Sequence, residues 1–159
     1  MNILGIDPGN ARMGFGVIRK EGSALAFVEA GVIGISSGTQ AEKLAAIGDG
    51  LERLIGRVKP GRIGIERLFF ARNVTTAMGV AEARGIAIRT AMAWVRDPGL
   101  IFEFTPQEVK KGTTNWGGAG KKEVARMVSL LLGMPKMDIL DDATDALAIA
   151  ICTANKRIF

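Results

Sequence analysis

Three apolar runs at the start of the chain, joined by links of only a few residues, restrict the possible folds more than any other feature. The runs are "NILGID" at 2–7, "MGFGVIRK" at 13–20 and "ALAFVEAGVIGI" at 24–35. Each has the composition of a β-strand, and the first is closed by Asp-Pro-Gly, a turn signal. Parallel neighbours need a crossover of a dozen or more residues, so the short links predict antiparallel pairing.

The rest of the chain alternates between helical and strand patterns. Apolar residues recur at three- and four-residue steps from Thr39 to Val58, which predicts an amphipathic helix. The glycine-rich segment 112–120 is expected to be a mobile loop. These patterns predict one α/β domain over residues 1–159, with a mixed five-stranded sheet flanked by helices. The other predicted elements are strands at 61–66 and 99–104 and helices at 74–95, 121–132 and 142–155.

The composition excludes several kinds of chemistry. The 159 residues include no histidine and one cysteine, so Ser-His-Asp or Cys-His catalysis, His-rich zinc sites and internal disulfides are excluded. Cys152 lies in an apolar stretch and is expected to be a packed core residue. The net charge of +5 favours a polyanionic partner such as nucleic acid. No leader-like start and no run of 18 apolar residues is found, so a cytoplasmic protein without a membrane partner is expected.

Acidic residues lie at the ends of two predicted strands and at the start of the last predicted helix. Asp7 ends the first strand and Glu66 ends the fourth, and ligands usually bind at strand ends of open sheets. Asp142 and Asp145 share a face of the first helical turn, but so do Asp141 and Asp145, which leaves the partner of Asp145 open. Glu66 has apolar neighbours on both sides in "IGIERLFF", which disfavours a fully solvated position.

Two interpretations of these acids are open at this point. If the first and fourth strands are adjacent and the last helix crosses their ends, four carboxylates meet, raise one another's pKa and require a cation. Oxygen ligands favour Mg²⁺ or Mn²⁺, and two such ions about 3.5–4 Å apart can support attack of water on a phosphodiester. The alternative is structural, with Asp7 in a turn, Glu66 on the surface and Asp142 as a helix cap.

Several sequence blocks resemble the RuvC family of Holliday-junction resolvases and occur in the family's order. They are "GIDPG" with "GFGVI", "IERLFFARN", "GVAEARGIA", "PQEVKK", "AGKKEVARMV" and "DDATDALAIA", and they cover nearly the whole chain. The resemblance implies an RNase H-like fold and Mg²⁺-dependent, symmetric nicking of four-way DNA junctions in recombination and repair. It further implies two Mg²⁺ ions per subunit, replaceable by Mn²⁺, a homodimer, and a branch-migration motor complex of the RuvA and RuvB type as partner.

The resemblance also assigns residues to the site. Asp141 is an extra acid beside the motif, either supporting the metal ligands or capping the helix. Lys110 and Lys121 look like the family's active-site lysines, although the neighbouring Lys122 leaves open which of that pair takes the role. The loop departs from the family pattern at Asn115 and at the adjacent Trp116. The catalytic and metal-binding acids implied by the resemblance are Asp7, Glu66, Asp142 and Asp145, with Lys121 as a further catalytic residue. The expected DNA-binding residues are Phe69, Arg72, Lys110, Lys111, Trp116 and Lys122.

Aromatic and small residues near the predicted site have expected roles of their own. Phe69 is expected to stack on an unpaired base, while Phe70 is expected in the core. Arg84 is a weaker candidate for a phosphate contact. The helix at 74–95 carries two apolar rows, one to cover the sheet and one whose small side chains suit a partner helix in a two-fold dimer. The rows are Met78, Ala81, Gly85, Ile88 and Met92, and Ala77, Val80, Ala87 and Ala91.

Other functions compatible with the sequence are a related RNase H-like nuclease acting on RNA and a junction-binding protein whose metal site has decayed. Cleavage of an RNA strand but not of a junction would select the first. Junction binding without cleavage under any divalent ion would select the second. An actin-like ATPase begins with a similar "GIDPG" turn but needs two such domains, which 159 residues do not supply.

Overall fold

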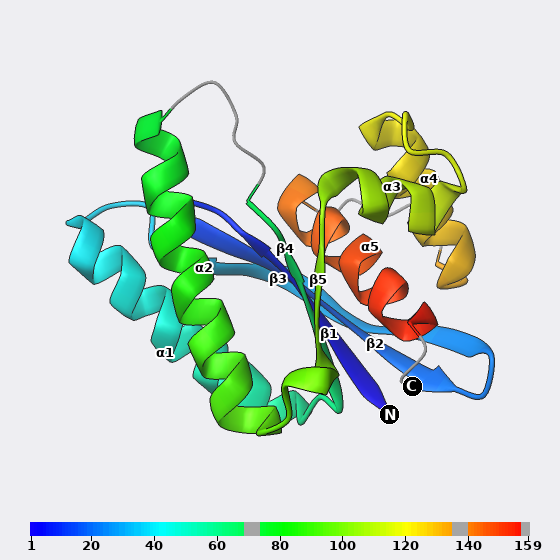
Figure 1. Ribbon diagram of the computed structural model, residues 1–159, viewed down its shortest axis with the longest axis horizontal. Helices are drawn as coiled ribbons and strands as arrows, with labels where there is room; N and C mark the ends of the chain where they lie inside the picture. Colours follow the sequence, from blue (N-terminus) through cyan, green and yellow to red (C-terminus); the bar gives the residue numbers. More distant parts are fainter. Residues whose placement is uncertain (69–73, 135–139, 157–159) are drawn as a thin grey trace.

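The computed structural model describes residues 1–68, 74–134 and 140–156, and its centre is a mixed five-stranded sheet (Figure 1). The strand order is β3-β2-β1-β4-β5. β1, β2 and β3 pair antiparallel, and β4 is parallel to both β1 and β5. The antiparallel start of the sheet and the adjacency of the first and fourth strands are therefore confirmed. The strands are β1 (Asn2–Pro8), β2 (Arg12–Glu21), β3 (Ala24–Gly34), β4 (Arg62–Glu66) and β5 (Ile101–Phe104).

Helices cover both faces of the sheet (Figure 1). On one side lie α1 (Gln40–Val58) and α2 (Val74–Val95), and on the other α3 (Pro106–Thr114), α4 (Lys121–Leu131) and α5 (Asp141–Asn155). A short 3-10 helix, η1 (Pro98–Leu100), takes up the first residues of the strand predicted at 99–104. Cys152 is buried as predicted, and its thiol donates to the carbonyl oxygen of Val109 at 3.5 Å. Of the helices in the described residues, none has the length and apolar character needed to cross a membrane.

The sequence patterns did not predict α3, and it occupies part of the segment expected to be a loop. Its start is set by a capping box, in which Thr105 Oγ1 accepts from the Glu108 amide at 3.2 Å and Glu108 Oε2 accepts from the Thr105 amide at 2.8 Å. Pro106 fills the first helical position, where its missing amide proton has no consequence. Asn115 ends the helix in the left-handed conformation, with a φ of 62°. The connection between α3 and α4 is thus reduced to residues 115–120.

The two-residue alternation of the central strands decides which residues face α5. In β1, Gly5 and Asp7 point to the same side, and in β4 Gly64 and Glu66 do so too. The intervening isoleucines belong to the core beneath α1 and α2. Each of these strands therefore presents a glycine and then an acid to the helix α5.

The glycines allow the backbone of α5 to contact the sheet directly. A Cβ atom on Gly5 would overlap the carbonyl oxygen of Ala146, and one on Gly14 of β2 would overlap the carbonyl oxygen of Asp142. Glycine in a strand is the residue that permits such an approach. The first turn of α5, with its acids, is consequently held beside the end of β1 and the start of β2.

Candidate active site

The carboxylates of Asp7 and Glu66 meet at one edge of the sheet. β1 and β4 pair Gly5 with Gly64 and Ile6 with Ile65, so the next step along both strands sets Asp7 opposite Glu66. A hydrogen bond joins the two side chains. Burial, together with the negative charge of its neighbours, raises the pKa of Asp7 to about 6 and that of Glu66 to about 8. In the metal-free site Glu66 therefore keeps its proton at neutral pH, and its O–H donates a hydrogen bond to Asp7.

The acids of α5 complete the negative side of the site. Burial raises the pKa of Asp145, and the charges of Asp141 and Asp142 add to this effect. The helix begins after Leu140, the N-cap residue, whose side chain makes no hydrogen bond to the free amide groups of the first turn. The interpretation of Asp142 or Asp141 as the helix cap is therefore wrong, because both carboxylates lie within the first turn. We call Asp7, Glu66, Asp142 and Asp145 the acidic site.

Positively charged side chains face the acidic site from three elements. Arg12, at the start of β2, places its Nε 2.5 Å from Oδ2 of Asp142. Lys121, the first residue of α4, places its Nζ 3.8 Å from Oδ2 of Asp145 and 3.6 Å from that of Asp141. Lys110 on α3 is close enough for its charge to lower the pKa of Asp145. Of the adjacent residues Lys121 and Lys122, it is Lys121 that forms ion pairs with the acids.

The donor atoms of the acidic site suit a hard divalent cation. All four side chains offer carboxylate oxygens, the ligands of Mg²⁺ and Mn²⁺. Burial and, after it, the neighbouring carboxylates raise the pKa values of Asp7 and Glu66, and a cation would favour their ionised forms. Within residues 1–68, 74–134 and 140–156, however, no three Asp, Glu or Cys side chains are placed to hold one metal ion together. One of the four carboxylates, that of Asp142, is paired with Arg12 instead.

Arg84 has a role that the sequence analysis missed. Its Nε donates to the carbonyl oxygen of Glu66 at 3.2 Å, and its Nη2 forms an ion pair with Glu103 of β5. The Arg84 side chain is only 22% exposed and is engaged in this ion pair; its role as a phosphate contact stays a prediction. Arg84 ties α2 to the ends of β4 and β5, and it thereby holds the backbone that carries Glu66.

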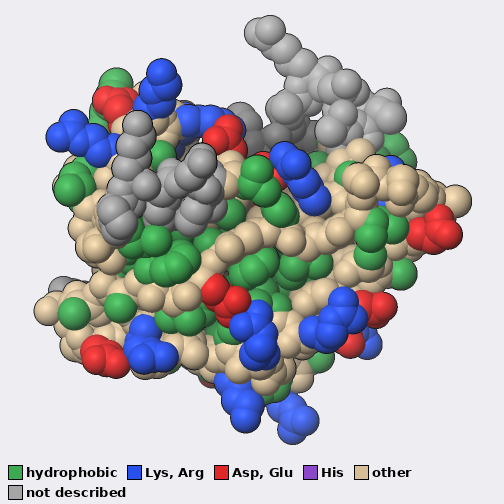
Figure 2. All heavy atoms as spheres, turned by 180° about the vertical axis from the view of Figure 1, so that it is seen from behind, with side chains coloured by type: hydrophobic (Ala, Val, Ile, Leu, Met, Phe, Trp, Pro, Cys, Tyr) green, Lys and Arg blue, Asp and Glu red, His purple; other side chains and the backbone are tan. Residues whose placement is uncertain are grey.

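The predicted DNA-binding residues are distributed over different parts of the molecule. Phe69 and Arg72 lie outside the described residues, as does Phe70. Lys122 and Trp116 are exposed, and Trp116 borders a shallow groove against α4. Lys111 lines another hollow, next to Lys156 at the end of α5. The face in Figure 2 shows hydrophobic side chains across its centre, with basic and acidic side chains side by side near its lower rim.

The sheet has this strand order, acids lie at the ends of two adjacent parallel strands, and a second pair of acids lies on the helix that crosses them. This arrangement defines the class of RNase H-like nucleases. The chain also matches the model of the family "Crossover junction endodeoxyribonuclease RuvC" over residues 3–153. It therefore belongs to the RuvC family of crossover junction endodeoxyribonucleases.

Individual relatives agree with this assignment. The chain is 46% identical to the crossover junction endodeoxyribonuclease RuvC of Rubrobacter xylanophilus over 153 residues, which cover 96% of this chain and 84% of that protein. It is 43% identical to the one from Chloroflexus aggregans, covering 97% and 93%. Among solved structures, the Thermus thermophilus RuvC in complex with a Holliday junction substrate superposes with a TM-score of 0.85 at 29% identity, covering 96% and 92%. The predicted fold class and family are confirmed.

Proposed function

We propose that this member of the RuvC family resolves four-way DNA junctions by divalent-metal-dependent hydrolysis at the acidic site. The observation that carries the proposal is the hydrogen-bonded, charge-crowded pair Asp7 and Glu66, facing Asp145 across the end of the sheet. Protein carboxylates that repel one another in a partly buried site are a candidate for function because that arrangement opposes folding. Family membership makes the chain an endonuclease of crossover junctions.

In the proposed site, Asp7, Glu66, Asp142 and Asp145 would hold two Mg²⁺ ions, with Mn²⁺ as a substitute. When bound, the ions would supply Lewis-acid stabilisation of the phosphodiester and an activated water for attack on phosphorus. Lys121 would stabilise negative charge on the phosphate or accept a proton from the water, and Lys110 would hold the DNA backbone. The products would be a 5′-phosphate and a 3′-hydroxyl.

DNA contacts outside the acidic site belong to the same proposal. Phe69 would stack on an unpaired base, and Arg72 would contact phosphates. The exposed side chains of Lys111, Trp116 and Lys122 would contact the arms of the junction. A branch-migration motor complex of the RuvA and RuvB type would deliver the junction.

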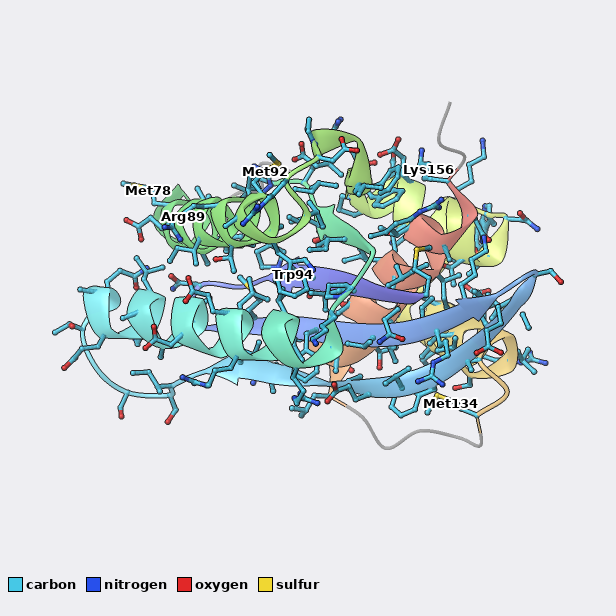
Figure 3. All side chains as sticks on the ribbon, turned by 90° about the horizontal axis from the view of Figure 1, so that it is seen from below. Met78, Arg89, Met92, Trp94, Met134 and Lys156 are labelled. Atoms are coloured by element: carbon cyan, nitrogen blue, oxygen red, sulfur yellow. The ribbon has the colours of Figure 1, made fainter. Side chains whose placement is uncertain are left out.

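The proposed assembly is a two-fold dimer through α2. Ala83, Ala87 and Ala91 are buried toward α1 and the sheet, so this side of α2 is already covered. Met78 is 64% exposed, and Figure 3 shows it with Met92 on the outer side of the helix. Small side chains along this outer side would allow a second copy of α2 to approach closely. Each subunit of such a dimer would supply one site to one of the two scissile strands.

The experiment that tests this function is incubation of a synthetic immobile junction with the protein and Mg²⁺ or Mn²⁺. We expect paired, symmetric nicks that disappear in Asp7→Asn, with junction binding retained. Robust nicking by Asp7→Asn would overturn the assignment of the acidic site. Binding without cleavage by the natural chain under either ion would instead favour a junction-binding protein. An RNA–DNA hybrid run alongside tests the RNA nuclease alternative.

A further inference from the structure

The start of β2 places the positively charged side chain of Arg12 beside Asp142, which the proposed mechanism uses as a metal ligand. Arg12 and Gly14 lie on the same side of β2, because alternate residues of a strand point to the same face. Gly14 contacts the backbone of Asp142, so the side chain two residues earlier arrives beside the carboxylate of Asp142. The resulting pair, Nε to Oδ2 at 2.5 Å, is held in place by the direct contact of β2 with α5.

In this ion pair, Arg12 neutralises Asp142, one of the four acids of the acidic site. The pairing of Asp7 with Gly14 across the β1–β2 hairpin puts the end of β1 next to the same turn of α5. Asp142 is close enough to Asp7 and Asp145 for its charge to raise the pKa of both. The guanidinium occupies Oδ2 of Asp142, and its positive charge repels a cation that binds the same carboxylate through Oδ1. Arg12 thus competes with a metal for this ligand.

The exposure of the two side chains shows how the competition can be relieved. The Arg12 side chain is 60% exposed, whereas that of Asp142 is 28% exposed. The guanidinium can therefore move into the DNA-facing solvent while Asp142 stays in the site. An arginine released at that point would face the negatively charged backbone of bound DNA, for which its fork of donors is suited.

We propose that Arg12 is a positioning residue that exchanges partners: it neutralises Asp142 while the metal is absent and contacts a DNA phosphate when the metal is bound. The inference rests on the proposed function, since it takes Asp142 as a metal ligand. Its consequence is that metal and junction binding strengthen each other, because each ligand favours the state in which Arg12 has left Asp142. Such coupling is reciprocal by thermodynamic necessity.

The first test measures Mn²⁺ binding to the DNA-free protein, from the signal of free Mn²⁺ in electron paramagnetic resonance. Arg12→Gln is expected to bind Mn²⁺ about two- to fivefold more tightly, the range of a partly exposed ion pair. Arg12→Lys, which keeps the charge, should stay near the natural protein. Arg19→Gln is the matched control, because it removes the same charge from the exposed far end of β2. Unchanged or weaker Mn²⁺ binding by Arg12→Gln would overturn the proposal.

The second test measures junction binding with and without a divalent ion that slows cleavage, such as Ca²⁺. In EDTA, Arg12→Gln should bind the junction nearly as the natural protein does, because Arg12 must give up its ion pair with Asp142 to contact a phosphate, and the two energies offset each other. In Ca²⁺ the variant should bind about two- to fivefold more weakly. An equal loss under both conditions would show a permanent DNA contact and overturn the exchange. If the natural chain binds Mn²⁺ and cleaves junctions but the Arg12 variants show no difference, only this inference fails; absence of Mn²⁺ binding overturns the proposed function as well.

Discussion

Because the pKa of Glu66 is raised, the free energy of unfolding of the metal-free protein should depend on pH, and metal binding should change that dependence. The unfolded chain releases this proton near the ordinary pKa of 4.5, whereas the folded metal-free protein retains it up to about 8. Unfolding therefore releases a proton between these values, and the free energy of unfolding falls as pH rises through this window. The stability associated with the protonated site is fully present below pH 4.5 and is lost by about pH 8.

The perturbation is Glu66→Gln, which keeps a donor toward Asp7 and carries no charge at any pH. The slope for one group is at most about 1.4 kcal/mol per pH unit, so the full window corresponds to roughly 5 kcal/mol. Solvent access to the site reduces this to about 2–3 kcal/mol. We expect the metal-free variant to be more stable than the natural protein by that amount at pH 8 and equally stable at pH 4.5.

Urea unfolding followed by circular dichroism in EDTA at pH 4.5, 6 and 8 measures this difference. Glu21→Gln, at the exposed end of β2, is the matched control and should show no pH-dependent gain. Saturating Mg²⁺ at pH 8 should stabilise the natural protein far more than Glu66→Gln, because ligand binding to the folded state adds to its stability. A gain for Glu66→Gln that is the same at pH 4.5 and pH 8, or no gain at pH 8, would refute the reasoning.

Further predictions concern packing, positioning, assembly and DNA binding. Gly5→Ala should lower the free energy of unfolding by about 2–3 kcal/mol, because the added methyl group meets the backbone of α5. Gly56→Ala in α1 has open space around it and should raise the free energy of unfolding by about 0.5–1 kcal/mol. Thermal or urea unfolding measures both changes. Arg84→Gln leaves Glu103 without its cation, and we expect a loss of about 1–2 kcal/mol together with a reduced nicking rate at saturating junction, while an unchanged rate would contradict its positioning role. Ala81→Glu on the outer side of α2 should shift sedimentation toward the monomer, and an unaffected dimer would place the interface elsewhere. Junction affinity should fall linearly with the logarithm of salt concentration in a binding titration, and a flat response would contradict phosphate-based recognition.

Most elements and the acids of the site could be predicted because their signals are local. Apolar runs, helical periodicity and acids at strand ends are visible within a few residues. The predicted strand end at Glu66 is correct, and that at Asp7 is one residue short of the observed end at Pro8. The helix α3, which was not predicted, is short. Its buried residues are Val109 and Thr113, too few to show a helical periodicity in the sequence. Its capping box from Thr105 to Glu108 was the signal that could have revealed it.

The two arginine ion pairs of the site were harder to predict than its lysines, because the partners of these arginines are distant in the chain. Arg12 meets Asp142, and Arg84 meets Glu103, only after the sheet and its covering helices have assembled. No spacing in the sequence encodes either pair. A glycine followed two residues later by an acid, as at Gly5 in β1 and again in β4, is a pattern that the sequence does contain. It indicates a strand face that admits a helix closely and then presents a carboxylate.

The direct contact between α5 and the strands has a consequence for how the enzyme can adapt to its substrate. Two elements separated by long side chains can slide when those side chains change rotamer, but backbone against backbone at Gly5 and Gly14 leaves no such freedom. The acids of α5 therefore behave as a rigid extension of the sheet. Accommodation of differently shaped junctions therefore falls to the long side chains around the site, such as Arg12 and Lys121, while the backbone that carries the acids stays in place.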